Sequence, residues 1–359
     1  MKFSITGPTI LARTKRRKTP IPLKIIGSLR DGRKIAVNES KRAADASMAV
    51  FPGYLIYPGN RNLDKAAEIV VKFSPDYLED KFLTLEKKIL MKLYDLEGIP
   101  RVIEQGVAGV SYWGYDQNRL KCIERNAPFF VMSKIEGRNL NSLTLKMQEK
   151  VMPSRKEVAF LASKVFPLLA ERLAGIHDKK VVHRDVKPQN VMIDRKEDSL
   201  TLIDFGRANW LNTSTPRSDF GTFGFLPPEL ILSKPKVEDV RVDVYALGVT
   251  CFKVLTGEKA ILYSGMKNDW QNIWSSVQYF SNMSSMKNYY RMLCFFGRLS
   301  PEELIMLSNM PSDLKQTGLG KYLGRLFHPA RIKRPYNMWK IAENLRKFGG
   351  ELAELEIWS

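Results

Sequence analysis

Short apolar runs dominate the first third of the chain. They occupy Lys34–Val37, Ala49–Tyr57 and Glu68–Phe73, and Pro-Gly and Asn turns bound them. β-Branched and aromatic residues between turn formers favour strands. Two more runs follow at Arg101–Gly106 and Pro128–Ile135. The pattern therefore predicts a strand-rich layer over roughly the first 135 residues.

Helical periodicity enters this layer once and dominates the rest of the chain. Asp80–Leu93 carries Phe82, Leu85, Ile89 and Leu93 at helical spacing, which predicts one amphipathic helix. Longer helical patterns follow at Glu157–His177 and Asp243–Leu255, and two strand-like segments separate them, at Val191–Asp194 and Leu200–Ile203. The order predicts a small β-rich part followed by a larger helical part.

Composition narrows the class of protein. The chain has 359 residues, of which 44% are hydrophobic and 26% charged, as in ordinary globular proteins. No apolar run approaches the roughly 18 residues of a membrane span, and no secretory segment stands near the start. Three widely spaced cysteines form no metal-type pair, which fits a reducing compartment. We therefore expect a cytoplasmic protein without a transmembrane segment.

The net charge of +19 is partly local. Residues 1–30 contain eight Lys or Arg residues and no acidic residue, with a cluster at Arg13–Lys18. Pro8, Pro20 and Pro22 interrupt regular patterns, so we expect residues 1–32 to form a basic N-terminal arm outside the folded domain. Such an arm can bind an anionic polymer or membrane surface, serve as a nuclear or organellar address, or remain solvated without a specific partner.

Two short motifs carry the strongest chemical signal. His183–Asn190 reads H-R-D-V-K-P-Q-N, and Asp204–Gly206 reads D-F-G. Phosphoryl transfer needs positioning, metal ions and an acceptor for a hydroxyl proton. Asp185 supplies a proton acceptor, Asn190 and Asp204 supply hard oxygen ligands for Mg²⁺, and Lys187 supplies a positive charge for the transferring group.

Together these motifs resemble the eukaryotic-type protein kinase superfamily, and the resemblance covers about residues 33–348. It implies an α+β, two-lobed protein-kinase-like fold. A small β-rich N-lobe with one helix would span residues 33–135, and a larger helical C-lobe residues 136–359. By the same resemblance, Lys72 in V-V-K-F would hold the ATP phosphates, and Glu86 would be its helix partner.

Further positions match the family. Phe130–Gly137 resembles the hinge segment, which implies that Met132, Ser133 and Ile135 contact adenine, with Val50 and Met192 as apolar walls. Gly221–Glu229 resembles the end of an activation segment. The resemblance also implies that Arg334 pairs with Glu229, and that Asp243 belongs to a buried helix anchoring the catalytic loop. His183 would be structural.

One element departs from the family. The segment that aligns with the glycine-rich phosphate loop is Ala43–Val50, which contains no glycine and places Asp45 where a glycine is usual. Backbone amides approach phosphates most closely where glycine is present. We therefore expect an unusual phosphate lid and weaker nucleotide binding.

The expected activity is transfer of the γ-phosphate of Mg·ATP to Ser or Thr hydroxyls of protein substrates. Serine/threonine specificity follows by analogy from Lys187, two residues after Asp185. Two alternatives stay open: a catalytically weak nucleotide-binding scaffold, and a small-molecule kinase of related fold. Activation by phosphorylation is a further hypothesis, with four candidate sites: Thr213, Ser214, Thr215 and Ser218. Thr222 is instead expected to contact the substrate or Asp185.

Overall fold

A computed structural model describes most of the chain. The described residues are 3–14, 17–41, 48–60, 62–74, 76–77, 79–116, 119–142, 155–213, 222, 224–227, 229–230, 239–257, 261–262, 306–307, 312–328 and 330–354. They fall into two compact units. The N-terminal unit comprises Met1–Asp95 and Pro100–Ile135, and the C-terminal unit comprises Leu96–Ile99 and Glu136–Ser359.

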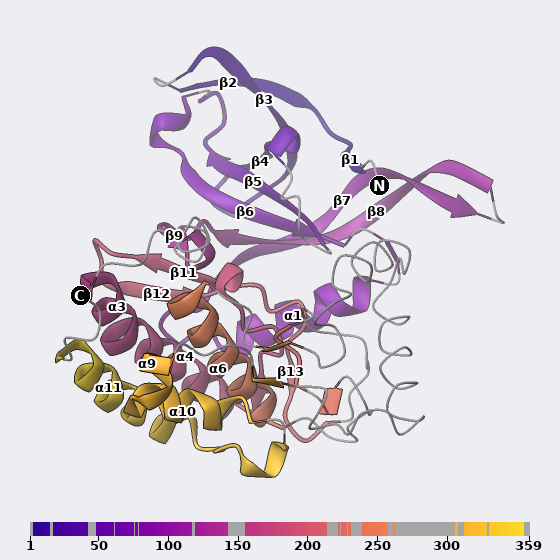
Figure 1. The fold of residues 1–359 in the computed structure, drawn as a ribbon. Helices are drawn as coiled ribbons and strands as arrows, with labels where there is room; N and C mark the ends of the chain where they lie inside the picture. Colours follow the sequence, from indigo (N-terminus) through magenta and orange to yellow (C-terminus); the bar gives the residue numbers. More distant parts are fainter. Residues whose placement is uncertain are drawn as a thin grey trace. The chain divides into compact units, whose positions relative to one another are not determined.

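The described part of the N-terminal unit is built on one eight-stranded sheet (Figure 1), in the spatial order β1-β7-β8-β6-β5-β4-β3-β2. All of its strand pairs are antiparallel. One face carries a core that includes Phe51, Val71, Phe73, Phe129 and Val131. The strands are β1 (Phe3–Ile5), β2 (Thr9–Thr14), β3 (Arg17–Ser28), β4 (Lys34–Val37), β5 (Ala49–Ile56), β6 (Ala67–Phe73), β7 (Val102–Asp116) and β8 (Arg119–Ser133).

The structure corrects the basic arm expected over residues 1–32, because strands β1, β2 and β3 belong to this sheet. Buried and exposed residues alternate along this segment, as in a strand with one face in the core: Ile21 and Leu23 are buried, whereas Pro20 and Pro22 are exposed. This half of β3 pairs with β2, while β4 pairs only from Lys24 onward. A proline is tolerated where one side of its strand lacks a neighbour.

Helix α1 (Asp80–Lys92) follows β6. Of the four apolar positions that predicted it, Phe82, Ile89 and Leu93 are buried and Leu85 is partly buried, and the helix also buries Leu83 and Leu90. Strands β7 and β8 pair along their whole length, from Val102 to Asp116, and are longer than the apolar runs that predicted them. Short 3₁₀ turns lie at η1 (Glu39–Lys41) and η2 (Leu63–Lys65).

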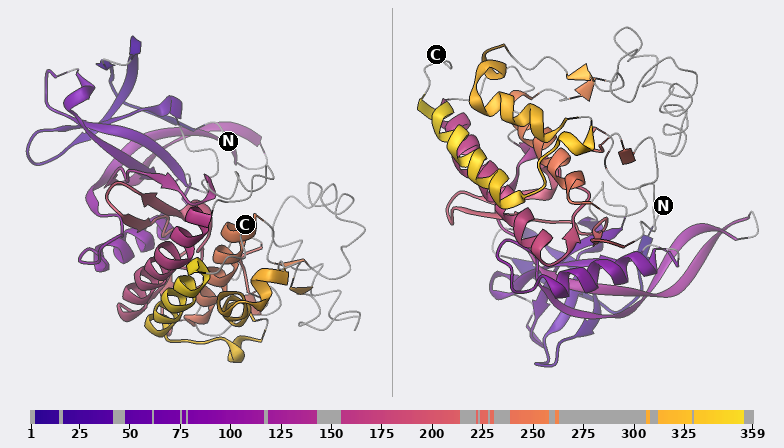
Figure 2. Two further views of the ribbon diagram at one scale, coloured as in Figure 1. Left: turned by 60° about the vertical axis from the view of Figure 1, so that its left-hand side comes forward. Right: turned by 90° about the horizontal axis from the view of Figure 1, so that it is seen from below.

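The C-terminal unit is mainly helical in its described part. α3 (Arg155–Phe160), the π-helical turn η3 (Leu161–Val165) and α4 (Phe166–Asp178) form one continuous stretch. α11 (Met338–Glu354) lies beside it (Figure 2). α6 (Arg241–Thr256) is buried almost throughout and ends at Gly257, which has a left-handed φ of 70°. Smaller helices are α9 (Ser312–Gln316), α10 (Gly318–Leu326), η4 (Pro188–Asn190) and η5 (Arg331–Lys333).

Short strands frame the predicted catalytic segments. β11 (Val191–Asp194) pairs with β12 (Ser199–Leu202) and β9 (Arg138–Asn139). β10 (Val181–Val182) pairs with β13 (Asn209–Trp210), and β14 (Ile261–Leu262) with β15 (Met306–Leu307). Among the described residues, no helix is long and apolar enough to cross a membrane.

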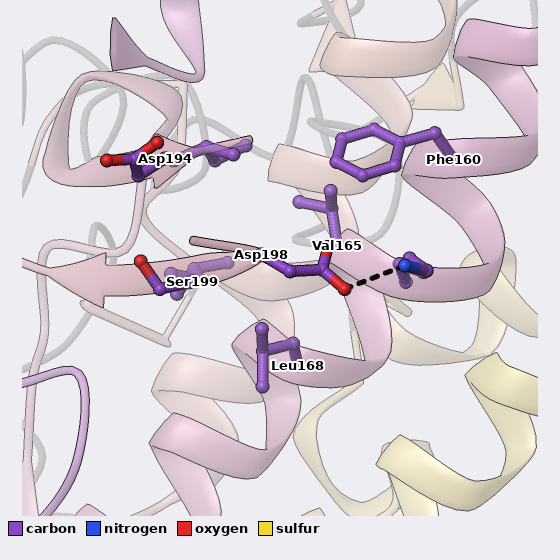
Figure 3. A pocket seen from close by; sticks show the side chains of 9 residues that line it. Phe160, Val165, Leu168, Asp194, Asp198 and Ser199 are labelled. Atoms are coloured by element: carbon purple, nitrogen blue, oxygen red, sulfur yellow. Dashed lines mark hydrogen bonds and ion pairs between the residues drawn. The ribbon is translucent and has the colours of Figure 1, made fainter. Parts of the chain in front are cut away.

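A small cavity lies between the π-helical turn and the β11–β12 hairpin (Figure 3). Phe160, Val165 and Leu168 line it from the helical side, and the ion pair between Lys164 and Asp198 spans its edge at 2.7 Å. The cavity encloses about 20 Å³, which is room for about one water molecule. It is too small to be a substrate site.

Candidate active site

Backbone register places three predicted nucleotide-contacting residues on one face of the N-terminal sheet. Lys72 on β6 lies opposite Val50 on β5 and opposite Phe130 on β8. Met132 lies opposite Val70, two residues before Lys72. Side chains alternate along a strand, and directly opposed residues share a face. Val50, Lys72 and Met132 therefore project to the same side.

The two remaining hinge predictions lie differently. Ser133 is exposed and lies opposite Ile69, so the register assigns its side chain to the other face of the sheet. Ile135 follows the end of β8 and is partly buried. The register therefore does not bring the Ser133 side chain to the face that carries Lys72.

A buried ion pair links the sheet to α1. Lys72 Nζ lies 2.7 Å from Glu86 Oε1, and the two residues are 4% and 2% exposed. Glu86 comes from the buried side of α1, between apolar residues that hold this side against the protein. The pairing predicted by resemblance is confirmed in geometry. A cation and a carboxylate that leave water together stabilise each other only in such close contact.

Sequence reasoning missed a second anchor of α1. Arg125 on β8 contacts Asp80, the first residue of the helix, at 2.6 Å. The Arg125 side chain is fully buried, and its guanidinium lies 4.4 Å from the ring centre of Tyr77. An acidic residue in the first turn also suits the helix dipole. The contact fixes the start of the helix that carries Glu86.

In the C-terminal unit, Asp243 on α6 holds the start of the predicted catalytic loop, His183–Asn190. Its carboxylate accepts backbone hydrogen bonds from His183 at 2.9 Å and Arg184 at 2.8 Å, and contacts His177 Nε2 at 2.8 Å. Burial raises the pKa of Asp243, but the contacts with His177 and His183 outweigh burial and hold that pKa below its usual value. The anchoring role predicted for this helix is confirmed in geometry.

His183 connects the loop to the D-F-G segment. Its Nδ1 lies 3.3 Å from the Asp185 amide, its Nε2 lies 3.2 Å from the Ile203 carbonyl, and its ring meets Phe205 edge-on at 4.7 Å. Burial lowers the pKa of His183 below its usual value. A neutral ring that accepts at Nδ1 and donates at Nε2 satisfies both contacts. His183 is therefore a structural residue, as predicted.

The Asp185 carboxylate is buried and surrounded by donors. Oδ1 accepts from the Thr222 hydroxyl at 2.7 Å and from its amide at 3.1 Å. Oδ2 lies 2.8 Å from Lys187 Nζ, 3.1 Å from Asn190 Nδ2 and 3.6 Å from Arg207 Nε. Burial raises the pKa of Asp185, but the charges of Lys187 and Arg207 outweigh burial and hold that pKa below its usual value. The group is therefore an ionised acceptor near neutral pH.

The predicted metal ligands come from two neighbouring segments. Asn190 ends η4 and donates to the Asp185 carbonyl at 2.8 Å, so its amide oxygen is the atom suited to a cation. Asp204 is exposed and has a φ of 63°, in the left-handed region. The described residues contain no group of three or more His, Cys, Asp or Glu side chains placed to hold a metal. Mg²⁺ fits this smaller donor set, because it usually combines one or two protein ligands with water and substrate phosphates.

A second ion pair, with a buried arginine, lies at Glu229, the last residue of the segment Gly221–Glu229 that was predicted to end an activation segment. Arg334 donates to both carboxylate oxygens of Glu229, at 2.7 and 2.8 Å, and also to the His328 carbonyl at 2.6 Å. Its guanidinium lies 4.7 Å from the Tyr245 ring centre. The pair predicted from resemblance is confirmed. Two-point contact of this kind fixes orientation as well as charge.

The other predicted positions are only partly described. Met192 lies on β11 between Thr201 and Asn139, and it is partly buried. Thr213 donates its hydroxyl to the Trp210 carbonyl at 2.7 Å. The other three candidate phosphorylation sites lie outside the described residues, as do Ala43, Ala44, Asp45 and Ala46 of the predicted lid.

Comparison with known proteins identifies the class. Residues 120–313, more than half of the chain, match the protein kinase domain family. The chain therefore belongs to the protein kinase family. The serine/threonine-protein kinase PknL of Mycobacterium tuberculosis is 30% identical over 232 residues, which cover 64% of this chain and 52% of the relative. An Aurora kinase of Patiria pectinifera is 38% identical over 105 residues, 29% of this chain and 25% of that relative.

The matched segments thus span between a quarter and about half of these relatives' own length. A solved structure, that of the Cydia pomonella granulovirus kinase PK-1, superimposes with a TM-score of 0.52 at 16% identity, covering 85% of this chain and 93% of the viral one. This likeness shows a shared fold, and it confirms the predicted two-lobed kinase architecture.

Proposed function

We propose that this protein is an ATP-dependent kinase that phosphorylates Ser or Thr hydroxyls of protein substrates. One observation carries the proposal: the buried Asp185 carboxylate accepts a hydrogen bond from a threonine hydroxyl, that of Thr222, at 2.7 Å. A carboxylate that binds one such hydroxyl has the geometry to orient another.

The chemistry assigns one role to each group. The acceptor oxygen forms a bond to the γ-phosphorus, the bond from that phosphorus to the β,γ-bridging oxygen breaks, and ADP leaves with the electron pair. Asp185 orients the acceptor and takes its proton. Lys187, already 2.8 Å from Asp185, offers a positive charge to the transferring group.

The N-terminal unit contributes Lys72, held by Glu86, for the α/β-phosphates, and Val50 and Met132 as apolar contacts for adenine. Ser133 and Ile135 belong to the predicted hinge, and Met192 of the C-terminal unit is a further apolar contact. Mg²⁺, held by Asn190 and Asp204, would neutralise phosphate charge. The specificity for Ser or Thr is supported by Lys187 and by the names of relatives such as PknL.

Labelled ATP, Mg²⁺ and a generic protein substrate test the proposal. Recovery of labelled phosphoserine or phosphothreonine after acid hydrolysis is the expected result. Nucleotide binding without transfer would instead favour the catalytically weak scaffold, and transfer only to small molecules would favour the small-molecule kinase.

Binding of an anionic polymer or membrane surface by Arg13–Lys18 is a separate part of the proposal. Arg13 lies near the end of β2 and Arg17 begins β3, so deletion of residues 1–30 would remove strands from the sheet. Replacement of Arg13 and Arg17 by Ser is the better test. We expect weaker binding to heparin or anionic vesicles and a smaller salt dependence, with unchanged peptide phosphorylation. Binding identical to that of the unmodified protein would contradict this role.

A further inference from the structure

Asp185 Oδ2 has two cations beside it, and only one of them is explained by the proposed mechanism. Lys187 Nζ lies 2.8 Å from this oxygen and Arg207 Nε lies 3.6 Å from it. The Asp185 side chain is 1% exposed, whereas 24% of the Arg207 side chain reaches solvent. Arg207 directly follows the D-F-G segment, and the motif itself assigns it no role.

Lys187 is shared among several contacts. Its ammonium group lies 2.7 Å from the Thr222 hydroxyl and 2.8 Å from Asp185. The proposed function also directs it to the transferring phosphoryl group. When Lys187 turns to phosphate, Asp185 loses its nearest positive charge while its carboxylate remains buried. A buried carboxylate without a nearby cation is strongly disfavoured.

We propose that Arg207 is a positioning residue for Asp185, supplying a fixed positive charge that keeps the carboxylate oriented while Lys187 engages the phosphoryl group. The inference rests on the proposed function. It extends that function to a residue beside the motif, and it explains how one lysine can serve two partners.

The backbone fixes Arg207 from both sides. Before it, Phe205 is buried against His183. Around it, the Ala208 amide donates to the Phe205 carbonyl at 2.9 Å and so closes a turn that contains Arg207. After it, Asn209 pairs with Val182 in the β10–β13 ladder. These contacts hold the backbone on both sides of Arg207, whose Nε lies 3.6 Å from Asp185 Oδ2.

Arginine suits this position chemically. The guanidinium stays charged at any working pH and cannot pass a proton to the carboxylate that it supports. It is also less strongly hydrated than an ammonium group, so it tolerates a partly buried contact.

Steady-state kinetics test the role. Arg207→Met keeps most of the side-chain volume and removes the charge. We expect kcat to fall about tenfold to a hundredfold while KM for ATP changes less than about twofold, because the interaction serves Asp185 and not the nucleotide. Arg207→Lys should recover most of kcat. Arg325→Met, which removes an exposed arginine of α10, is the control and should leave kcat unchanged. Unchanged kcat in Arg207→Met, or no recovery in Arg207→Lys, would overturn the role.

A second measurement does not depend on turnover. Urea unfolding midpoints of Arg207→Met, Asp185→Asn and the double variant form a cycle. We expect Arg207→Met to lower the midpoint in the unmodified protein and to have little effect beside Asp185→Asn. If Arg207→Met lowers the midpoint equally with and without Asp185→Asn, the proposed interaction between the two residues is wrong, even if the protein is active. If the unmodified protein transfers no phosphate but the cycle still shows coupling between Arg207 and Asp185, only the proposed function is contradicted.

Discussion

Lys72 Nζ lies 2.7 Å from Glu86 Oε1, and both residues are buried. The contact joins β6 to α1, so it both secures the helix and sets the direction of the lysine. Removal of one partner leaves the other charge buried alone, which typically costs about 3–5 kcal/mol. We therefore expect this pair to affect both stability and phosphoryl transfer.

The first prediction separates these effects. Lys72→Met should lower the free energy of unfolding by about 3–5 kcal/mol and nearly abolish transfer. The double variant Lys72→Met, Glu86→Leu should regain much of the stability, because neither charge remains, but no activity. Urea unfolding and a transfer assay on both proteins measure this. A single variant as stable as the double one would show that the ion pair is not the relevant contact.

The second prediction concerns Thr222. Thr222→Val keeps the shape of the side chain but removes the hydroxyl that joins Asp185 to Lys187. Hydrogen bonds to charged groups contribute roughly 1.5–3 kcal/mol, so the transfer rate should fall about tenfold or more. Thr222→Ser keeps the hydroxyl and should retain most of the rate. Equal rates for the Val and Ser variants would contradict the role of the hydroxyl.

The third prediction compares a buried and an exposed arginine. Arg334→Met breaks a two-point contact with Glu229 in which the arginine side chain is fully buried and the Glu229 side chain is 17% exposed, and should cost about 3–5 kcal/mol of unfolding free energy. Arg346→Met breaks a surface contact with Glu171, in which the arginine side chain is 57% exposed, and should cost at most about 1 kcal/mol. Equal losses in chemical denaturation would show that burial does not decide the strength of these pairs.

The fourth prediction is acid destabilisation. The pKa of His183 is lower in the folded protein than its unfolded value of about 6.5, so the unfolded chain binds the proton first as pH falls. The pKa of Asp243 is also lowered, so its contribution is present above about pH 3.9 and is lost as pH falls through its folded value. Both effects reduce stability in acid.

Urea midpoints between about pH 7.5 and pH 4.5 measure the first of these effects. The unmodified protein should lose stability steadily as pH falls below about 6.5. His183→Phe, which keeps a ring against Phe205, should be less stable at neutral pH but should lose less on acidification. A variant with the same pH dependence as the unmodified protein would exclude His183 as the titrating group.

Local motifs predict the candidate chemistry but not the contacts around it. Asp185, Asn190 and Asp204 stand out in the sequence because the spacing of their two motifs is typical of one function. Arg207 directly follows the D-F-G motif, but its approach to Asp185 depends on the turn after Phe205, which the amino-acid sequence alone does not reveal. Arg125 meets Asp80 across 45 residues, and no sequence pattern connects the two.

Strand register limited the prediction of the N-terminal unit. A shift of one residue moves a side chain to the other face of a sheet, so only the observed pairing separates Ser133 from the face that carries Lys72. The arm over residues 1–32 was inferred from the basic charge of this segment and from Pro8, Pro20 and Pro22. Pro20 and Pro22 instead lie on the exposed side of β3. The alternation of these exposed prolines with the buried Ile21 and Leu23 was the better indication of a strand.

The most direct measurement is transfer of labelled phosphate by Asp185→Asn beside the matched variant Asp198→Asn. Asp198 is a surface carboxylate, 61% exposed and paired with Lys164, so its loss should leave transfer unchanged. Asp185→Asn keeps the shape of the side chain but removes the proton acceptor, and should lower transfer by about 10²–10⁴-fold. Its fold and ATP affinity should stay close to those of the unmodified protein. Undiminished transfer by Asp185→Asn would contradict the assignment of Asp185 and with it the proposed kinase mechanism.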